Sequence, residues 1–173
     1  MRVYNVHERQ LPVSAAEAGA LIDTLSGPDD TLWPKDRWPA MKLDTPLRRG
    51  ARGGHGAVRY SVHDYVPGKR IVFRFDGTGL TRGLEGDHLF EVVPGQSHVV
   101  FRHIVDAEGG LKDWLQWKCI VGPLHDALLE DALNRAEYAL MGSVARPARW
   151  SLWVRFLRRM LQRKRGDAMK SAV

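Results

Sequence analysis

The sequence predicts an α+β fold in which one long helix near the C-terminus covers an antiparallel β-sheet. From about residue 47, apolar and polar residues alternate in four short segments separated by Gly- and Pro-containing turns, a pattern typical of antiparallel strands. After two consecutive glycines, the apolar residues recur at helical spacing over residues 114–136. A sheet and a helix that each have one apolar face are stable when those faces pack together.

Length and composition indicate a single domain. The chain has 173 residues, of which 44% are hydrophobic, enough for one sizeable core. Cys119 is the only cysteine, which excludes an intrachain disulfide, and residues 1–10 lack the apolar segment of a secretory signal. No apolar stretch reaches the roughly 18 residues that a membrane span needs. We therefore expect a cytoplasmic protein.

The N-terminal region predicts a strand followed by a helix. Residues 2–13 (RVYNVHERQLPV) are predicted to form a short strand. Ser14 is a suitable N-cap for the helix that follows, and Glu17, three residues later, completes a capping box. The next segment, 29–44, contains two prolines, which prevent a long regular element. It also contains two tryptophans, whose apolar rings are expected to pack against another part of the chain.

Two histidines are predicted to face the interior from one β-hairpin. If residues 94–97 (PGQS) form a four-residue loop, His88 lies opposite His103 and Phe90 lies opposite Phe101. Alternate residues of a strand share a face, so these four side chains point to the same side. The other side carries charged residues. The side with the phenylalanines is therefore the better candidate for the interior.

The preceding hairpin places a carboxylate on the same apolar face. A two-residue or a four-residue turn keeps Tyr60, Val62 and Asp64 on the side of Phe73 and Phe75. Asp64 is then an acidic side chain among apolar neighbours, which makes it a candidate functional residue.

The long helix has one apolar side. Pro123 either begins this helix or kinks a longer one, and the helix ends near residues 141–142. His125 and Asp126, at the start of the helix, are expected to be capping or surface residues. The apolar side consists of Trp114, Trp117, Val121, Leu124, Leu128, Ala132 and Ala136.

The order of these elements and four segments of the chain resemble the START-like superfamily, also called SRPBCC or the polyketide cyclase/dehydrase and birch-allergen-like group. The segments are RRGARGGHGAVRY, EGDHLFEVVPG, SHVVFRHIVDAEGG and LQWKCIVGPLHDALLEDALNRAEYAL. The resemblance covers residues 2–142 and implies a helix-grip fold, in which a curved antiparallel sheet wraps around a long C-terminal helix. We expect a START-like ligand-binding domain at residues 1–142 and a basic tail with an extra amphipathic helix at residues 143–173.

The resemblance implies a cavity between sheet and helix, open at one end and lined by the inward-facing side chains. The first hypothesis is binding of a small hydrophobic ligand, for transport or processing. The second is a cyclase- or dehydratase-type enzyme in which His88 or His103 moves a proton, with Asp64 as a further catalytic candidate. A structural role, with each buried histidine satisfied by a carbonyl, a tyrosine or a water, stays open. The expected ligand-binding residues are Tyr60, Val62, Phe73, Phe75, His88, Phe90, Phe101, His103 and Trp117.

Neither a cofactor nor a metal is predicted. His88, His103 and Asp64 lack the HxH, HxxxH or CxxC spacing of a local ligand set. The glycine-rich segment 48–56 (RRGARGGHG) precedes a strand rather than a helix and has no GK[ST] ending, so it is not a phosphate-binding loop. The resemblance implies that this segment forms a flexible turn at the cavity mouth, and we expect its arginines to be solvated.

The positive charge of the chain belongs to its tail. Residues 1–145 contain 17 Lys plus Arg and 19 Asp plus Glu, whereas residues 146–165 contain eight basic residues and no acidic one. The overall net charge of +6 is therefore not a property of the predicted domain, and no nucleic-acid partner is predicted.

The tail predicts an amphipathic helix, and contact of residues 148–165 with an anionic membrane surface, as a membrane-peripheral interaction module, is one hypothesis for its role. On a helix of about 100° per residue, tryptophans and aliphatic residues fall on one face and arginines largely on the other. The alternatives are that the apolar face packs on the domain or on a second copy in a homodimer. If the helix contacts a membrane, we expect the cytoplasmic protein to be membrane-associated. The expected membrane-surface residues are Trp150, Trp153, Arg155, Leu157, Arg158 and Arg159.

Overall fold

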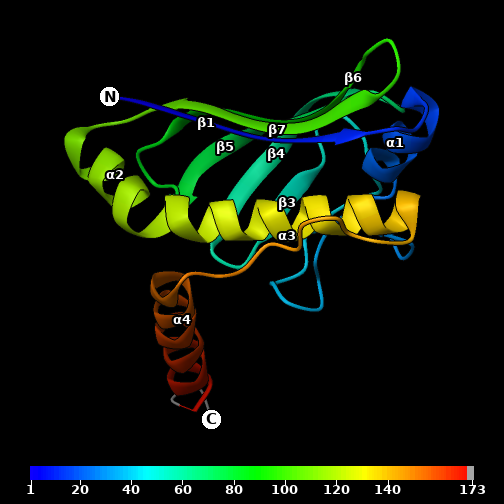
Figure 1. Ribbon diagram of the computed structural model, residues 1–173. Helices are drawn as coiled ribbons and strands as arrows, with labels where there is room; N and C mark the ends of the chain where they lie inside the picture. The colour runs from blue at the N-terminus through cyan, green and yellow to red at the C-terminus, as the bar shows by residue number, and fades with distance from the viewer. Residues whose placement is uncertain (171–173) are drawn as a thin grey trace.

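The computed structural model describes the backbone of residues 1–170 and the side chains of residues 1–162 (Figure 1). Two parts of the predicted tail, the side chains of residues 163–170 and the whole of residues 171–173, lie outside the described residues. The strands are β1 (Arg2–Leu11), β2 (Lys42–Leu43), β3 (Arg52–His55), β4 (Val58–Val66), β5 (Arg70–Gly79), β6 (Glu85–Pro94) and β7 (Val99–Glu108). The helices are α1 (Ala15–Asp23), α2 (Leu111–Gln116), the π-helical turn η1 (Trp117–Val121), α3 (Gly122–Met141) and α4 (Leu152–Lys170).

The predicted α+β helix-grip architecture is confirmed. The strands form one antiparallel sheet in the order β1-β7-β6-β5-β4-β3-β2. In Figure 1 the sheet curves over α3, which runs along its concave face, and α1 lies at one end of the sheet. β2 and β3 are short strands at one edge that the alternation of apolar residues does not predict.

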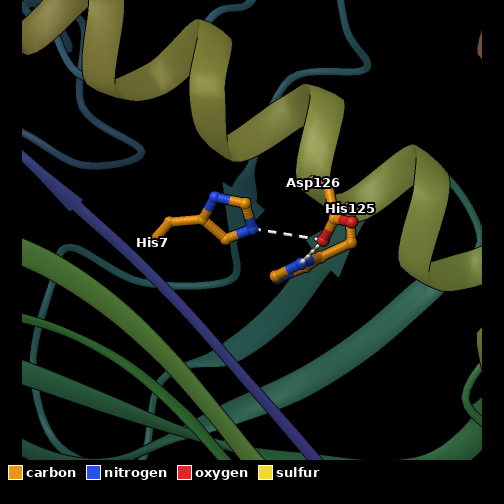
Figure 2. Close-up of side chains that lie close together, drawn as sticks. All are labelled: His7, His125 and Asp126. Atoms are coloured by element: carbon orange, nitrogen blue, oxygen red, sulfur yellow. Dashed lines mark hydrogen bonds and ion pairs between the residues drawn. The ribbon is translucent and has the colours of Figure 1, made fainter. Parts of the chain in front are cut away.

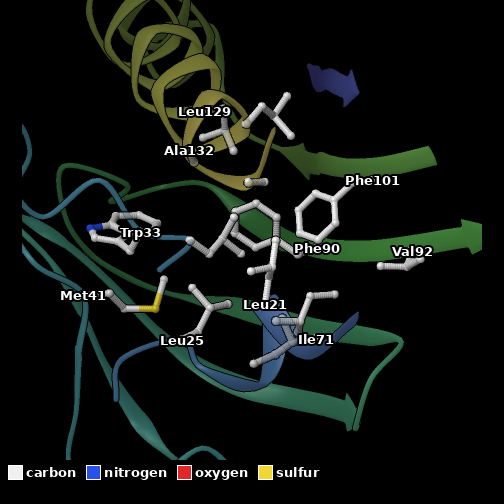
Figure 3. Close-up of a cluster of buried hydrophobic side chains, with 14 of the residues drawn as sticks. Leu21, Leu25, Trp33, Met41, Ile71, Phe90, Val92, Phe101, Leu129 and Ala132 are labelled. Carbon is white, nitrogen blue, oxygen red and sulfur yellow. The ribbon is translucent and has the colours of Figure 1, made fainter. Parts of the chain in front are cut away.

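Local sequence signals produce the first strand and helix as predicted. The N–H of Glu17 donates to Oγ of Ser14 (3.2 Å), and the N–H of Ser14 donates to the Glu17 carboxylate (2.9 Å), which completes the capping box of α1. The apolar face of α1 then packs between the sheet and α3 in the main core (Figure 3). This core includes Leu21, Leu25, Ile71, Phe90, Phe101 and Leu129.

The hairpin of β6 and β7 has a register two residues away from the predicted one. Phe90 lies opposite His103, so His88 and His103 are not direct partners. The loop comprises residues 95–98 rather than 94–97, and a backbone hydrogen bond of 2.8 Å between its first and last residues closes it. Because the shift is an even number of residues, each side chain keeps its predicted face.

A β-bulge removes Asp64 from the inner face of the sheet. Val62 lies opposite Phe73, but the register then shifts by one residue and Asp64 pairs with Val72. The Asp64 carboxylate forms an ion pair with Arg70 (2.7 Å), and both side chains are partly exposed. The prediction that Asp64 faces the interior is therefore wrong, because an extra residue in β4 reverses the alternation.

The glycine-rich segment, predicted as a flexible turn, is in part a strand. Its second half forms β3, which pairs with β2 on one side and β4 on the other. A Cβ on Gly53 would lie 1.9 Å from the carbonyl oxygen of Lys42, so this close pairing requires glycine. Residues 56–57 make the turn from β3 to β4.

The helical path over residues 111–141 is continuous but irregular at its proline. The π-helical turn η1 comes directly before Pro123 in α3. Pro123 has no N–H to donate to the carbonyl of Cys119, four residues earlier. The indole N–H of Trp153 in α4 donates to this carbonyl (2.8 Å). Of the two predicted alternatives, the longer helix with an irregular turn is therefore the one observed.

The first part of the tail packs on the domain. Val154 and Leu157 of α4 are buried against Leu124 of α3. The buried carboxylate of Asp131 in α3 accepts a hydrogen bond from the indole N–H of Trp150 (2.9 Å) and two more from the segment between α1 and β2. Beyond these contacts α4 projects away from α3 (Figure 1).

Candidate functional site

A cavity of about 370 Å³ lies between the inner face of the sheet and α3. Its wall is apolar apart from four histidine rings and one threonine. The lining residues are Trp33, Trp38, Pro39, His55, Gly56, Ala57, Val58, Phe75, Leu80, Thr81, His88, His103, Trp117, Val121, Leu124, His125, Leu128, Leu129 and Leu161.

Four histidines from four different elements meet at this cavity. His55 ends β3, His88 and His103 lie in β6 and β7, and His125 lies in the first turn of α3. Nδ1 of His88 is 3.3 Å from Nε2 of His103, so the two rings share a hydrogen bond. The ring centroid of His103 is 5.0 Å from that of His125. The rings of His88, His103 and His125 therefore form a continuous row.

Burial keeps these rings neutral. Removal from water, with repulsion between neighbouring imidazoles, lowers the pKa of His55 to about 3 and lowers the pKa values of His88 and His103 well below the ordinary range. Burial also lowers the pKa of His125. A neutral imidazole has one N–H donor and one lone pair. The row thus combines proton donors and acceptors without net charge.

Aromatic side chains hold His88 in place. Its ring stacks on Phe73 and Phe75, with centroid distances of 5.0 and 4.9 Å, and meets Tyr60 edge-on at 4.9 Å. The hydroxyl of Tyr60 is hydrogen-bonded to Nδ1 of His55 (3.1 Å). Burial raises the pKa of Tyr60, so this hydroxyl keeps its proton.

The predicted ligand-binding residues fall into two groups. The first group lines the cavity and contains Phe75, His88, His103 and Trp117. The second group is buried in the core without lining the cavity and contains Tyr60, Val62, Phe73, Phe90 and Phe101. Asp64, predicted as a catalytic candidate, belongs to neither group and pairs with Arg70 instead.

Three of the histidines described here escape prediction from the sequence. His55 lies in the glycine-rich segment, whose pairing as a strand depends on backbone contacts rather than on alternation. His125 follows a proline at a predicted helix start, and the expectation of a capping or surface residue is wrong, because its side chain is 15% exposed and lines the cavity. His7 lies in β1 and faces α3 rather than the apolar core.

His7 belongs to a second polar cluster next to His125 (Figure 2). Nε2 of His7 lies 3.1 Å from Oδ1 of Asp126, and Nδ1 lies 2.8 Å from Oε1 of Glu130. Burial opposes charge on this ring, but the two carboxylates outweigh burial and raise the pKa of His7 to about 9. Within the described side chains, His7, His125 and Asp126 are the group whose ligand atoms lie close enough to hold a metal ion.

α4 borders the cavity where it reaches the protein surface. Leu161 of α4 lines the cavity and is itself 40% exposed. Three other lining residues, Gly56, Ala57 and Leu80, are also at least partly exposed. The opening therefore lies between the β3–β4 turn, the end of β5 and α4.

Comparison with known proteins shows the fold of the chain. No family model and no curated protein matches it. Norcoclaurine synthase from Thalictrum flavum, solved with dopamine and hydroxybenzaldehyde, is similar with a TM-score of 0.63 and 11% identity over 84% of this chain and 90% of that one. A Thermobifida fusca protein gives a TM-score of 0.61 and 15% identity over 84% and 99% of the two chains. CalU16 from Micromonospora echinospora gives a TM-score of 0.54 and 13% identity over 97% of this chain and 86% of that one.

These structures confirm the predicted START/SRPBCC-type fold. At identities of 11% to 15% the similarity is one of fold alone. The cavity between sheet and long helix, and the side chains that line it, therefore have to be interpreted from their own chemistry.

Proposed function

We propose that this protein binds a small hydrophobic molecule in the cavity between its sheet and α3. The observation that carries the proposal is the cavity wall, which is built of aliphatic and aromatic side chains with neutral histidines among them. Apolar walls supply affinity by removing ligand surface from water, and a few polar groups fix the orientation of the ligand. Hydrophobic ligands are common among proteins of this fold, which supports the proposal.

The volume of the cavity and the charge of its lining residues narrow the class of ligand. Pockets for small molecules range from about 300 to 1,000 Å³. At about 370 Å³ this cavity suits a compact, ring-containing molecule better than a long-chain lipid. Among the described lining residues there is no Lys, Arg, Asp or Glu. A charged ligand would therefore lack a counter-ion, and an uncharged aromatic or isoprenoid-like molecule fits best.

One amino-acid change at two positions tests the proposal. Val121→Phe adds a ring to the cavity wall, whereas Val66→Phe makes the same change at an exposed position away from the cavity. We expect Val121→Phe to weaken fluorescence-detected binding of the neutral probe N-phenyl-1-naphthylamine at least about tenfold, a loss of about 1.4 kcal/mol. Val66→Phe should bind like the wild type. Equal affinity in both variants would contradict the proposal.

A cyclase- or dehydratase-type enzyme that uses the same cavity is the second candidate. It is favoured by the hydrogen-bonded pair of His88 and His103, because a neutral imidazole can accept a proton at one ring nitrogen and donate one from the other. Native mass spectrometry of protein purified from its source cells would identify the bound molecule. For an enzyme, His103→Ala should then reduce turnover of this molecule far more than its binding. Equal losses would favour a binding protein.

The outer face of α4 favours a third function, docking on an anionic membrane surface. Leu152, Phe156 and Met160 follow one another at helical spacing and are 81%, 49% and 45% exposed. Arg155 and Arg159 are also exposed and flank this row. An apolar row beside arginines suits the boundary between lipid headgroups and acyl chains. Because α4 borders the cavity opening, docking would bring that opening close to the lipid.

The predicted membrane-surface residues divide between this outer face and the domain. Those exposed are Trp153, Arg155 and Arg159, and those packed on the domain are Trp150, Leu157 and Arg158. The guanidinium of Arg158 lies 4.0 Å from the ring centroid of Trp150. Over residues 1–170, the structure contains no helix that is long and apolar enough to cross a membrane.

Vesicle flotation tests the docking function. The full chain should float with vesicles of phosphatidylcholine and phosphatidylserine, and less with phosphatidylcholine alone. The double variant Phe156→Ser with Arg159→Ser should float with neither kind of vesicle. Lys69→Ser, in the turn between β4 and β5, should float like the wild type. Concentration-dependent dimerisation without flotation would assign the same face to a second copy.

A further inference from the structure

Three potential metal ligands converge between β1 and α3 (Figure 2). Nε2 of His7 lies 3.1 Å from Oδ1 of Asp126, and Nδ1 of His125 lies 3.8 Å from the same oxygen. One ligand atom from each of the three residues lies within 4.8 Å of the other two. Ligand atoms around a tetrahedral Zn²⁺ ion are about 3.3 Å apart, since each bond is about 2.0–2.1 Å long. The three atoms can therefore share one ion after small side-chain movements.

We propose that His7, His125 and Asp126 form a binding site for a divalent transition-metal ion such as Zn²⁺. Two imidazole nitrogens and one carboxylate oxygen suit Zn²⁺ and its neighbours rather than Mg²⁺ or Ca²⁺, which prefer oxygen ligands. Three protein ligands leave one coordination position for water or another molecule. His125 also lines the cavity, so the site adjoins the cavity wall.

Neighbouring side chains hold these ligands in position. Oε1 of Glu130 lies 2.8 Å from Nδ1 of His7 and accepts its N–H, so an ion would displace only the proton on Nε2, which faces Asp126. Arg9 donates a hydrogen bond to Glu130 (3.0 Å), and the amide of Asn5 donates one to Oδ1 of Asp126 (3.0 Å). A carboxylate behind a histidine is the common arrangement that orients a metal-binding ring.

The ring of His125 supplies an independent argument. Both of its nitrogens are shielded from solvent and lack a hydrogen-bond partner in the described part of the chain. Buried polar atoms nearly always have a partner, and a metal ion would supply one to Nδ1. Without an ion, a protonated His7 between Asp126 and Glu130 accounts for the rest of the cluster as an ion-pair network but leaves His125 unexplained.

Calorimetric titration of the chelator-treated full chain with Zn²⁺ tests the proposal. We expect one ion per chain with a Kd tighter than about 10 µM. The Tm should rise with Zn²⁺, because only the folded chain brings the ligands together. If the wild type takes up no Zn²⁺ at these concentrations, the proposal is overturned and the cluster is an ion-pair network.

Substitutions locate the ion. His7→Gln and Asp126→Asn should abolish Zn²⁺ binding, with circular dichroism confirming that each variant folds. Glu130→Gln should weaken binding about 10- to 100-fold and Glu130→Asp less, because Glu130 acts by positioning His7. His63→Ala and His98→Ala, outside the cluster, should bind like the wild type. Binding that survives in both ligand variants would place the ion elsewhere and overturn the proposal, whatever the result for ligand binding in the cavity.

Discussion

Nδ1 of His88 lies 3.3 Å from Nε2 of His103 on the concave side of the sheet, although the two residues are not paired across the strands. His88 lies opposite Val105 and His103 lies opposite Phe90, so the rings meet diagonally. Their hydrogen bond depends on both side chains sharing one face of the sheet and not on direct pairing.

The buried histidines predict that stability falls as the pH drops below about 6.5, the ordinary pKa of histidine. Burial lowers the pKa of His55 to about 3 and that of His88 well below its ordinary value. Below pH 6.5 the unfolded chain therefore binds protons that the folded protein does not. The free energy of unfolding then rises with pH, and acidification removes about 1.4 kcal/mol per pH unit for each such ring.

Urea unfolding at a series of pH values measures this slope, and one substitution tests its origin. His88→Phe removes one titrating ring and keeps an aromatic side chain between Phe73 and Phe75. The slope between about pH 5 and pH 6 should decrease by about 1.4 kcal/mol per pH unit. An identical slope in His88→Phe and the wild type would show that His88 takes up a proton in the folded state.

Replacement of Asp131 is expected to loosen the tail. This carboxylate, whose side chain is 2% exposed, accepts hydrogen bonds from Trp38 (2.8 Å) and Trp150 (2.9 Å) and pairs with Arg37 (2.6 Å). Asp131→Ala removes the acceptor of both indole N–H groups and should lower the free energy of unfolding by about 1–3 kcal/mol in urea titrations. Asp131→Asn keeps an acceptor and should cost less. Equal costs would mean that the hydrogen bonds contribute little.

The indole of Trp153 should stabilise the docked position of α4. Its N–H donates to the carbonyl of Cys119, which lacks a donor from Pro123. Trp153→Phe removes this bond and should lower the free energy of unfolding by about 0.5–1.5 kcal/mol. Limited proteolysis between residues 142 and 151 should also become faster. Unchanged proteolysis would indicate that the other contacts of α4 are sufficient.

A methyl group at Gly53 should separate β2 from β3. The added Cβ would lie 1.9 Å from the backbone oxygen of Lys42, which cannot move without breaking the strand pair. We expect Gly53→Ala to destabilise the protein by about 1–3 kcal/mol in thermal or urea unfolding. The same change at Gly110 meets only a side-chain oxygen of Asp113 at 3.2 Å and serves as the control. Similar effects at both positions would argue against the close strand contact.

Much of the fold follows from patterns that extend over only a few residues. The capping box of Ser14 and Glu17 begins α1, and the alternation of apolar residues identifies the long strands. Alternation also places His88 and His103 on the inner face despite a register error of two residues, because an even shift preserves the face of every side chain. The same rule fails at Asp64, where a bulge adds a residue that no local pattern announces.

The sequence by itself therefore determined the types of element, the inner faces of the strands outside the bulge and the cationic character of the tail, since these depend on near neighbours in the chain. Packing decided which of the inward-facing side chains line the cavity and which residues form the cluster around His7. His55 reaches the cavity because Gly53 allows β2 and β3 to approach, and His7 meets His125 only after α3 has crossed the sheet beside β1. Contacts between residues so distant in sequence leave no periodic signal, and they exist only in the folded chain.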